Sequence, residues 1–568
     1  MNKRSKIMIF GSVTIILIIA VFMGLRIKEI LTPSNEVMQL TDYYKVDEKE
    51  VMLILHDEIY EKKGKMIDEH VYLDYETVIN IFNHRFYWDK NEEKIVYTSP
   101  TEIVRADVDS YEYSIDSNEK ISYDAEAPLA RSISDDLYIS LDFVEEYSDI
   151  RAEFYEDPNR VIISYIWGDY LYTEVTRDSQ LRLEADIKSP ILDDLFEGDK
   201  LLFVDLHEPP KRGFSKVMTK EGIIGYVKDN FISESDYIEI KSSYQKPEYT
   251  DQTRDHKINL VFHQVFTSNE AGNLEDLISQ TQGVNVVSPT WFSIVDNEGT
   301  FTSLASNEYV SKAKELGLEV WALIDDFSPD VDMQELLSLT SVREKLIKAL
   351  MDKVDKYDLD GINIDFERVM PETGEHYVQF LRELSVKCRS EEIVLSVDNF
   401  VPPFKAHYDR VEQGEILDYI IIMAYDEHYS GSEQAGPNSS IGFVEDATRN
   451  IVNEIPKEKA IIAIPFYTRL WKETEEGDVS RERDFAMTPA ITWIEENGGE
   501  AKWDDGYGSY YVEVEKDGAI YKMWQEEVDS IEEKMKVIKE ADVGGVAAWK
   551  LGLERPEVWE VINKYLKK

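Results

Sequence analysis

Asp360-Gly361-Ile362-Asn363-Ile364-Asp365-Phe366-Glu367 is the stretch of this 568-residue chain that decides its fold. Successive side chains of a strand point to opposite faces, so the three apolar residues are predicted to share one face and Asn363, Asp365 and Glu367 the other. An edge strand with one solvent-facing side would show the same alternation. The segments on either side of the stretch decide between an edge strand and a buried one.

Helical patterns flank the stretch on both sides. From Ser341 to Tyr357 apolar residues recur at helical spacing, and Ser341 with Glu344 predicts an N-terminal capping box. A second helix is predicted after Pro371, with one apolar face. A strand between two helices belongs to a parallel α/β sheet, whose strands are covered on both faces and usually apolar throughout. Because buried carboxylates are costly unless paired or protonated, we interpret the polar face as catalytic.

Residues 255–568 are predicted to form a (β/α)₈ TIM barrel, an α/β fold. Eight strand candidates alternate with helices, at 258–265, 284–292, 319–326, 361–367, 393–400, 419–428, 460–471 and 544–553. A doubly wound open sheet is the alternative, but it would want a Gly-rich phosphate turn that the sequence lacks. Extra residues before the last strand predict an inserted α+β subdomain, with a hairpin at Asp517-Gly518 that joins 510–515 to 519–524 and walls one side of a cleft.

The carboxyl ends of barrel strands carry active sites, and Glu367 is expected to emerge there. A cleft with aromatic rings and a few carboxylates suits a sugar, whose ring face stacks while its hydroxyl groups need acceptors. Other polar or aromatic residues at predicted strand ends are Trp291, Asp325, Asp326, Tyr425, Asp426, Tyr467, Trp549 and Glu554.

Residues 360–367 match the signature Asp-Gly-x-Asp-x-Asp-x-Glu of the family 18 glycoside hydrolases except at Asn363, and residues 258–568 resemble that family. Three further segments support the resemblance: Met423-Ala424-Tyr425-Asp426, Ile464-Pro465-Phe466-Tyr467 and Gly545-Val546-Ala547-Ala548-Trp549. The resemblance implies that Glu367 is the general acid/base and that Asp365 orients the 2-acetamido group of the substrate. The predicted substrate-binding residues are Asn363, Tyr425, Asp426, Trp524 and Trp549. Asn363 departs from the signature, where Asp is usual.

The spacing of the two acids favours substrate-assisted hydrolysis. Asp365 and Glu367 lie side by side on one strand face, offset by about 7 Å, whereas a retaining nucleophile lies about 5 Å from the acid and across the bond. In the predicted mechanism the acetamide oxygen of the sugar attacks the anomeric carbon, Glu367 protonates the leaving oxygen, and Asp365 stabilises the developing charge. Because Asn363 removes a like charge, we predict that Asp365 ionises more readily than in a site with Asp at position 363, with the Asn363 amide as a candidate donor to it.

A membrane anchor is predicted in residues 1–30. Ile7 to Leu25 is free of charges and long enough to span a bilayer, and it follows Lys3, Arg4 and Lys6. The basic side is expected in the cytoplasm, which makes this a single-pass protein of the cell membrane with an extracellular catalytic domain. Cleavage of a signal peptide followed by secretion is the alternative.

Two modules are predicted between the anchor and the barrel. In residues 45–167 the order 71–73, 86–89, 94–97 resembles 137–139, 154–156, 160–163, which indicates a duplicated α+β module. It resembles the copper amine oxidase N-terminal-like domain, although His56, His70 and His84 are not placed to converge on copper. Residues 170–240 alternate short strands with turns and resemble a bacterial SH3-type domain, a small β-barrel. A polar linker, 241–256, follows.

The composition excludes several classes of partner. A formal net charge of −51, from 113 acidic and 62 basic residues, argues against nucleic acid. The single cysteine excludes an intrachain disulfide, and no histidine pair has metal-site spacing, so we predict neither metal nor other cofactor. No obligate protein partner is evident from the sequence.

The substrate class is predicted from the segment after Glu367. Met370-Pro371 and the helix that follows most resemble the branch of the family that acts on bacterial peptidoglycan, including spore-cortex N-acetylglucosaminidases. The predicted reaction is therefore hydrolysis of β-1,4-linked N-acetylglucosamine glycans, with peptidoglycan first. The alternatives are a hydrolase of chitin or chitooligosaccharides and a non-catalytic, lectin-like family 18 protein; such proteins usually lack the acid that Glu367 supplies.

Overall fold

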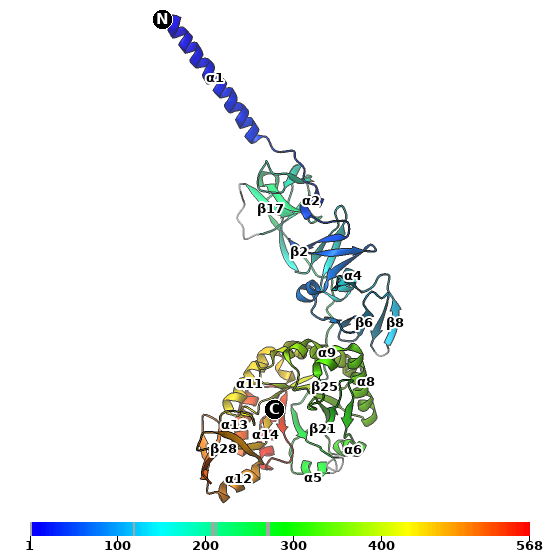
Figure 1. Cartoon of the computed structure of the whole chain (residues 1–568), viewed down its shortest axis with the longest axis vertical. Helices are drawn as coiled ribbons and strands as arrows, with labels where there is room; N and C mark the ends of the chain where they lie inside the picture. Colours follow the sequence, from blue (N-terminus) through cyan, green and yellow to red (C-terminus); the bar gives the residue numbers. More distant parts are fainter. Residues whose placement is uncertain (1–2, 118–119, 206–210, 212, 268–272, 568) are drawn as a thin grey trace. The chain divides into compact units, whose positions relative to one another are not determined.

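The computed structural model describes residues 3–117, 120–205, 211, 213–267 and 273–567, without the side chains of 3–9, 11 and 12. The chain divides into two compact units (Figure 1). Unit 1 comprises residues 1–86, 106–113 and 124–246, and unit 2 comprises 87–105, 114–123 and 247–568. The domain limits inferred from the sequence stay predictions, but segments 87–105 and 114–123 belong to the same unit as the barrel.

Unit 2 contains a closed barrel of eight parallel strands. Their order is β20-β33-β27-β26-β25-β24-β23-β21, and pairing of β20 with β21 closes the ring. All eight predicted strands are confirmed, and the open-sheet alternative is wrong. The strands are β20 (Ile258–His263), β21 (Val286–Ile294), β23 (Glu319–Asp325), β24 (Gly361–Asp365), β25 (Val394–Phe400), β26 (Tyr419–Met423), β27 (Ala460–Pro465) and β33 (Gly545–Trp549), with β22 (Phe301–Ser303) added antiparallel to β21.

Helices cover the outside of the barrel (Figure 1). They are α5 (Leu274–Ile278), α6 (Asn307–Glu315), α7 (Met333–Ser338), α8 (Thr340–Tyr357), α9 (Gly374–Ser390), α10 (Arg410–Ile416), α11 (Ile441–Glu454), α13 (Val528–Ala541) and α14 (Glu557–Leu566). Ile362, Ile364 and Phe366 join the large core between strands and helices, where Phe366 stacks on Phe380 of α9. A smaller cluster that includes Trp321 fills the barrel interior. The apolar face of the deciding stretch is therefore its helix-covered face.

The predicted inserted subdomain is confirmed between β27 and β33. Its sheet has the order β29-β28-β32-β31-β30, and the expected hairpin pairs Lys516 with Ala519 around Asp517 and Gly518. Both turn residues have positive φ, which suits a two-residue hairpin turn. The elements are β28 (Tyr467–Thr474), β29 (Val479–Ala486), α12 (Met487–Glu496), β30 (Lys502–Asp504), β31 (Ser509–Lys516) and β32 (Ala519–Gln525).

The N-terminus of α8 is capped by distant residues, so the predicted Ser341/Glu344 capping box is wrong. The Thr340 N–H donates to Asp89 at 2.6 Å, and the Ser341 N–H donates to Glu92 at 2.9 Å. Both acceptors belong to the turn and strands of the hairpin β4 (Phe86–Asp89) and β5 (Lys94–Thr98). Carboxylates near a helix N-terminus satisfy its free N–H groups and match its dipole. Asp89 and Glu92, which are distant in the sequence, therefore cap α8 in place of the predicted Ser341/Glu344 pair.

A five-stranded sheet, β4-β5-β6-β7-β8, packs on α8 and α9. It is completed by β6 (Ile103–Asp107), β7 (Glu112–Asp116) and β8 (Lys120–Asp124). Glu383 of α9 is fully buried and pairs with Arg105 of β6 at 2.9 Å and with Arg343 of α8 at 3.0 Å. Paired charges therefore hold this contact, and segments 87–105 and 114–123 of the sheet belong to the barrel unit.

We expect the stability of unit 2 to fall as the pH drops from about 6.5 toward 4. Burial, with a smaller effect of Arg343, lowers the pKa of His376 of α9 from 6.5 to about 4. The unfolded chain therefore takes up a proton at higher pH than the folded chain, and because solvent screens this partly exposed ring, the cost between pH 7 and pH 5 is about 1 kcal/mol. Urea unfolding of the wild type and of His376→Gln at both pH values checks this. Equal pH dependence of the two proteins would refute it.

Unit 1 contains two seven-stranded sheets. The first has the order β11-β12-β1-β2-β3-β10-β9, and the second β15-β14-β18-β17-β16-β13-β19. The first consists of β1 (Glu50–Leu55), β2 (Glu58–Ile67), β3 (His70–Asp74), β9 (Ala130–Ile133), β10 (Asp136–Ser140), β11 (Arg151–Tyr155) and β12 (Arg160–Ser164). The second consists of β13 (Gly168–Glu174), β14 (Ser179–Arg182), β15 (Ile191–Leu195), β16 (Lys200–Phe203), β17 (Phe214–Met218), β18 (Ile224–Lys228) and β19 (Asp236–Ile240).

The duplicated order of elements is present, but the hairpins of the two copies join different sheets. The order β3, helix, β4, β5 corresponds to β10, α4 (Leu141–Tyr147), β11, β12. Hairpin β11–β12 joins the first sheet of unit 1, whereas β4–β5 joins the sheet of unit 2. The strands of the second sheet lie in residues 168–240, in agreement with the short strands and turns predicted for residues 170–240. The likenesses to the copper amine oxidase N-terminal-like and SH3-type domains stay predictions.

The predicted membrane-spanning stretch, 7–25, falls within helix α1 (Lys3–Leu31). Across the described part of the chain, no helix has both the length and the apolar character that crossing a membrane requires.

Candidate active site

Asn363 and Asp365 of β24 lie in the barrel interior. Asn363 is fully buried and Asp365 is 5% exposed, while Ile362 and Ile364, which alternate with them, belong to the outer core. The strand is flanked by β23 and β25 on its two sides. The edge-strand interpretation is therefore wrong, and the polar face is buried among other strands.

Three aspartates lie in a row across neighbouring strands. Asp325 of β23 pairs in register with Asp365 of β24, and the register of β24 with β25 brings Asp398 opposite Asp365. Adjacent strands are about 4.8 Å apart. Within the described structure, the Oδ1 atoms of Asp365 and Asp398 have no hydrogen-bond partner. One proton held between the two carboxyl groups would satisfy both atoms.

The ionisation of both acids is disfavoured. Burial raises the pKa of Asp365 well above its usual range, and the charge of Asp398 raises it further. Burial likewise raises the pKa of Asp398 well above its usual range, against the effect of a hydrogen bond from Asn363. At neutral pH the two carboxyl groups are therefore not both charged.

Asn363 donates to Asp398 and not to Asp365. Its Nδ2 lies 2.6 Å from Asp398 Oδ2, and its Oδ1 accepts from Ser396 Oγ at 2.7 Å. The prediction that the Asn363 amide donates to Asp365 is therefore wrong, whereas easier ionisation of Asp365 than in a site with two Asp residues on the strand stays a prediction. Asp398, contributed by the next strand, supplies the like charge that Asn363 removes from β24.

We expect Asp398→Asn to move the acid limb of the pH–rate profile to lower pH. Removing the neighbouring negative charge lowers the pKa of Asp365, so its carboxylate persists at lower pH. Relative activity at pH 5 should rise roughly several-fold. Asp418→Asn is the control, because this buried aspartate accepts from the N–H groups of Gln252 and Leu395, away from the row. An acid limb that moves equally in both variants would count against Asp398.

Glu367 lies just beyond the carboxyl end of β24, as predicted. Its N–H and that of Arg368 donate to the two oxygens of buried Asp326, at 3.0 and 2.9 Å. Burial raises the pKa of Glu367 to about 7, Asp326 and Asp426 add to the shift, and Lys405 opposes it. A carboxyl group with this pKa can both donate and accept a proton near neutral pH.

The ends of β26 and β33 carry the predicted sugar contacts. Asp426 follows β26 and accepts from Tyr467 at 2.5 Å and from Arg469 at 2.9 Å. Tyr425 and Trp549 pack against the interior cluster. Burial raises the pKa of Tyr425 well above its usual range, and the charges of Asp398 and Asp365 raise it further, so its hydroxyl group lies near the row of aspartates.

Trp524 lies on the inserted sheet. Lys522 pairs with Trp471 across β28 and β32, so Trp524 shares a face with Arg469, the partner of Asp426. Trp524 is 8% exposed, and its ring packs against Tyr511. The predicted role of Trp524 in substrate binding stays a prediction.

Two of the strand-end candidates are structural. Trp291 is buried in the outer core against Tyr309, and Glu554 accepts from the Gly552 N–H and the Trp559 indole. Sequence reasoning missed Asp398, Lys405 and Arg469. Asp398 stands in the strand candidate 393–400, and its charge within an otherwise apolar and weakly polar strand was the signal that could have found it.

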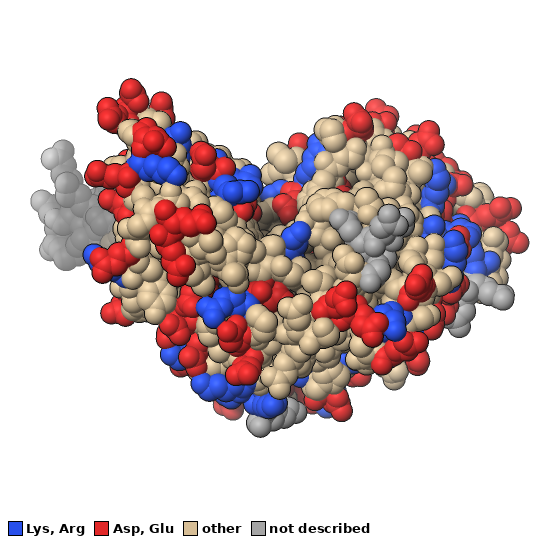
Figure 2. All heavy atoms as spheres, turned by 90° about the horizontal axis from the view of Figure 1, so that it is seen from below, with Lys and Arg blue, Asp and Glu red and all other residues tan. Residues whose placement is uncertain are grey.

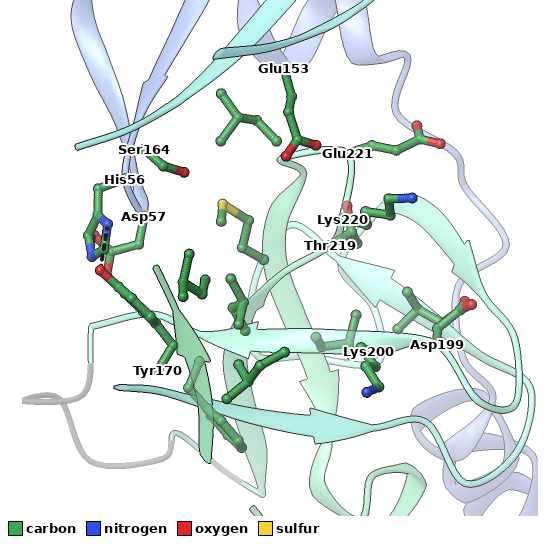
Figure 3. A pocket seen from close by; sticks show the side chains of 18 of the residues that line it. His56, Asp57, Glu153, Ser164, Tyr170, Asp199, Lys200, Thr219, Lys220 and Glu221 are labelled. Carbon is green, nitrogen blue, oxygen red and sulfur yellow. Dashed lines mark hydrogen bonds and ion pairs between the residues drawn. The ribbon is translucent and has the colours of Figure 1, made fainter. Parts of the chain in front are cut away.

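A cavity of about 750 Å³ lies in unit 1 between its two sheets (Figure 3). His56 and Tyr170 lie together on one side, with ring centres 4.9 Å apart, and Glu153 and Glu221 lie on another. The lining combines apolar side chains, among them Ile162, Leu195 and Leu201, with charged ones. Glu221 is paired with Arg160 at 3.0 Å. Burial also raises the pKa of Asp193 in this lining, but Asp325, Asp326, Asp365, Asp398 and Glu367, all with raised pKa values, lie together at β23, β24 and β25, so we place the candidate active site in the barrel.

Metal ligands are not grouped in the part of the chain that the structure describes: no three His, Cys, Asp or Glu side chains there could hold an ion together. In Figure 2, acidic and basic side chains are scattered in mixed groups over the face shown, and a hollow runs between two raised parts. A mixed surface of this kind differs from the basic patch that nucleic acid needs.

A barrel with a carboxylic acid at the end of its fourth strand and aromatic rings at other strand ends has the groups that a glycosidase uses to bind a sugar and to transfer a proton. The model of the family "Glycosyl hydrolases family 18" matches residues 237–554, more than half of the chain. The chain belongs to this family and is a glycosyl hydrolase.

Two curated relatives and one solved structure illustrate the similarity. The cortical fragment-lytic enzyme of Bacillus subtilis (strain 168) is 26% identical over 238 residues, 40% of this chain and 54% of that enzyme. The Bacillus anthracis enzyme of the same name is 23% identical over 304 residues, 51% of this chain and 70% of that enzyme. A C-terminal domain from Desulfitobacterium hafniense DCB-2 is similar in fold, with a TM-score of 0.50 and 21% identity over 55% of this chain and 100% of that one. The chain thus spans about half the length of the first relative.

Proposed function

We propose that the chain hydrolyses β-1,4-linked N-acetylglucosamine glycans with retention, using the substrate's own acetamide as nucleophile. The observation that supports this most is the state of Asp365, which is buried, faces Asp398 and has a raised pKa. With one proton shared by the pair, Asp365 can act as a carboxylate that accepts an acetamide N–H while Asp398 holds the proton, and its position two residues before Glu367 does not place it across the scissile bond as a nucleophile.

Glu367 moves the proton in both steps. In the first step its O–H protonates the glycosidic oxygen as the C1–O bond breaks, and the acetamide oxygen forms a new bond to C1. Asp365, as a carboxylate, accepts the acetamide N–H and stabilises the positive charge of the oxazolinium ring. In the second step Glu367 takes a proton from water, the water oxygen bonds to C1, and the ring opens. Two inversions at C1 give retention.

Peptidoglycan is the substrate that we propose, and the proposal includes the predicted extracellular location. Two relatives are named as cortical fragment-lytic enzymes, which supports a wall glycan. Mass analysis of the products from purified peptidoglycan tests this, with N-acetylglucosamine expected at the new reducing ends. Cleavage of chitin oligomers alone would favour the chitinase alternative. Glycan binding without cleavage would favour the lectin-like one.

A further inference from the structure

The loop after β25 holds the backbone of the segment that carries the proposed acid. Tyr408 Oη donates to the Phe366 carbonyl at 2.6 Å, and Lys405 Nζ donates to the carbonyls of Glu367 at 2.7 Å and Val369 at 2.9 Å. β24 ends at Asp365, so these carbonyl groups lie beyond the strand and need other partners.

The N–H groups of the same segment are held from the opposite side. Asp326, which follows β23, accepts from the N–H groups of Glu367 and Arg368. β23 and β25 are the two neighbours of β24 in the barrel. The turn at Glu367 is therefore fixed on both sides, by a carboxylate on one and an ammonium group on the other.

Lys405 also brings a positive charge to a mainly negative site. The acids facing Glu367 are Asp325 and Asp326 from β23 and its end, Asp365 from β24, Asp398 from β25 and Asp426 from the end of β26. Arg469 pairs with Asp426, while the hydroxyl groups of Tyr408 and Tyr425 stay neutral because burial raises their pKa values. The ammonium group of Lys405 lies over the rings of Phe400 and Tyr408, at 5.3 and 5.5 Å.

We propose that Lys405 is a positioning residue for the acid: its hydrogen bonds fix the turn at Glu367, and its charge balances the surrounding carboxylates so that Glu367 releases its proton near neutral pH. The proposal rests on the proposed role of Glu367. A cation near a carboxyl group favours the ionised form, so removing it favours the protonated form and extends activity to higher pH.

Three variants separate charge from hydrogen bonding. Lys405→Arg keeps both and should retain the wild-type pH profile. Lys405→Gln keeps a donor without the charge, and its basic limb should move to higher pH, with relative activity at pH 8.5 raised roughly threefold. Lys405→Met loses both and should add a fall in kcat of about tenfold or more, with little change in KM.

Lys459→Met is the matched control, because buried Lys459 also donates to a carbonyl, that of Leu417, at 2.8 Å. A pH profile and kcat of Lys405→Met equal to those of Lys459→Met would overturn the proposal. A ¹³C titration of the Glu367 carboxyl group, assigned with Glu367→Gln, needs no substrate. An unchanged titration in Lys405→Gln would refute the charge effect, whether or not the wild type cleaves glycan. Absence of glycan cleavage by the wild type would contradict the proposed function alone.

Discussion

Glu367→Gln is expected to lower glycan cleavage by about a thousandfold or more while binding of the glycan stays within about twofold. The amide keeps the size of the side chain, but it cannot give a proton to the leaving oxygen or take one from water, and general acid–base catalysis contributes 10²- to 10⁴-fold. The pKa of about 7 makes Glu367 the acid best matched to neutral pH. Initial rates and glycan binding, measured on the same preparations, check both parts.

Glu372→Gln is the control for this substitution. Glu372 is exposed in the short 3₁₀ helix that follows Glu367, and its substitution should leave the rate unchanged. Cleavage by Glu367→Gln at a tenth of the wild-type rate or faster would contradict the role of Glu367, provided that the control behaves as the wild type.

Glu383→Gln is expected to destabilise the protein by about 3–5 kcal/mol, since it leaves two buried arginines without their shared partner. Burial alone would raise the pKa of Glu383, but Arg343 and Arg105 outweigh it and lower the pKa, so the side chain is charged in the folded protein. Arg343 and Glu383 are fully buried, and Arg105 is 6% exposed. Urea unfolding at pH 7 measures the loss.

Glu375→Gln provides the comparison on the same helix, because Glu375 is exposed. It should change the free energy of unfolding by about 0.5 kcal/mol or less. An equal, small effect of both substitutions would contradict the view that the ion pairs hold the five-stranded sheet on the barrel. If Glu383→Gln loses stability while Glu367→Gln still binds the glycan, then Glu383 maintains the folded structure and Glu367 acts in the reaction.

The barrel and its central strand could be predicted because their signals are local. Strand β24 is indicated by the alternation of apolar and polar residues within eight positions. The hairpin at Asp517-Gly518 is indicated by its two turn residues alone. The position of Glu367 then follows from the rule that barrel active sites lie at carboxyl strand ends.

The partners of these residues could not be predicted in the same way. Which residue faces Asp365 depends on the register of β24 with β25, and nothing in either strand alone gives that register. The cap of α8 comes from Asp89 and Glu92, some 250 residues earlier in the chain. The predicted partners were neighbours in the chain, Asn363 for Asp365 and the Ser341/Glu344 pair for α8, whereas the observed partners are distant in the sequence.

The cleavage rate of a native N-acetylglucosamine glycan, compared with that of the same glycan after removal of its N-acetyl groups, tests the central claim most directly. Hydrolysis assisted by the substrate requires the acetamide oxygen as nucleophile, so the account predicts that the native glycan is cleaved and that the deacetylated glycan is not. Cleavage of both glycans at similar rates would contradict it, because the nucleophile would then have to come from the protein or from water.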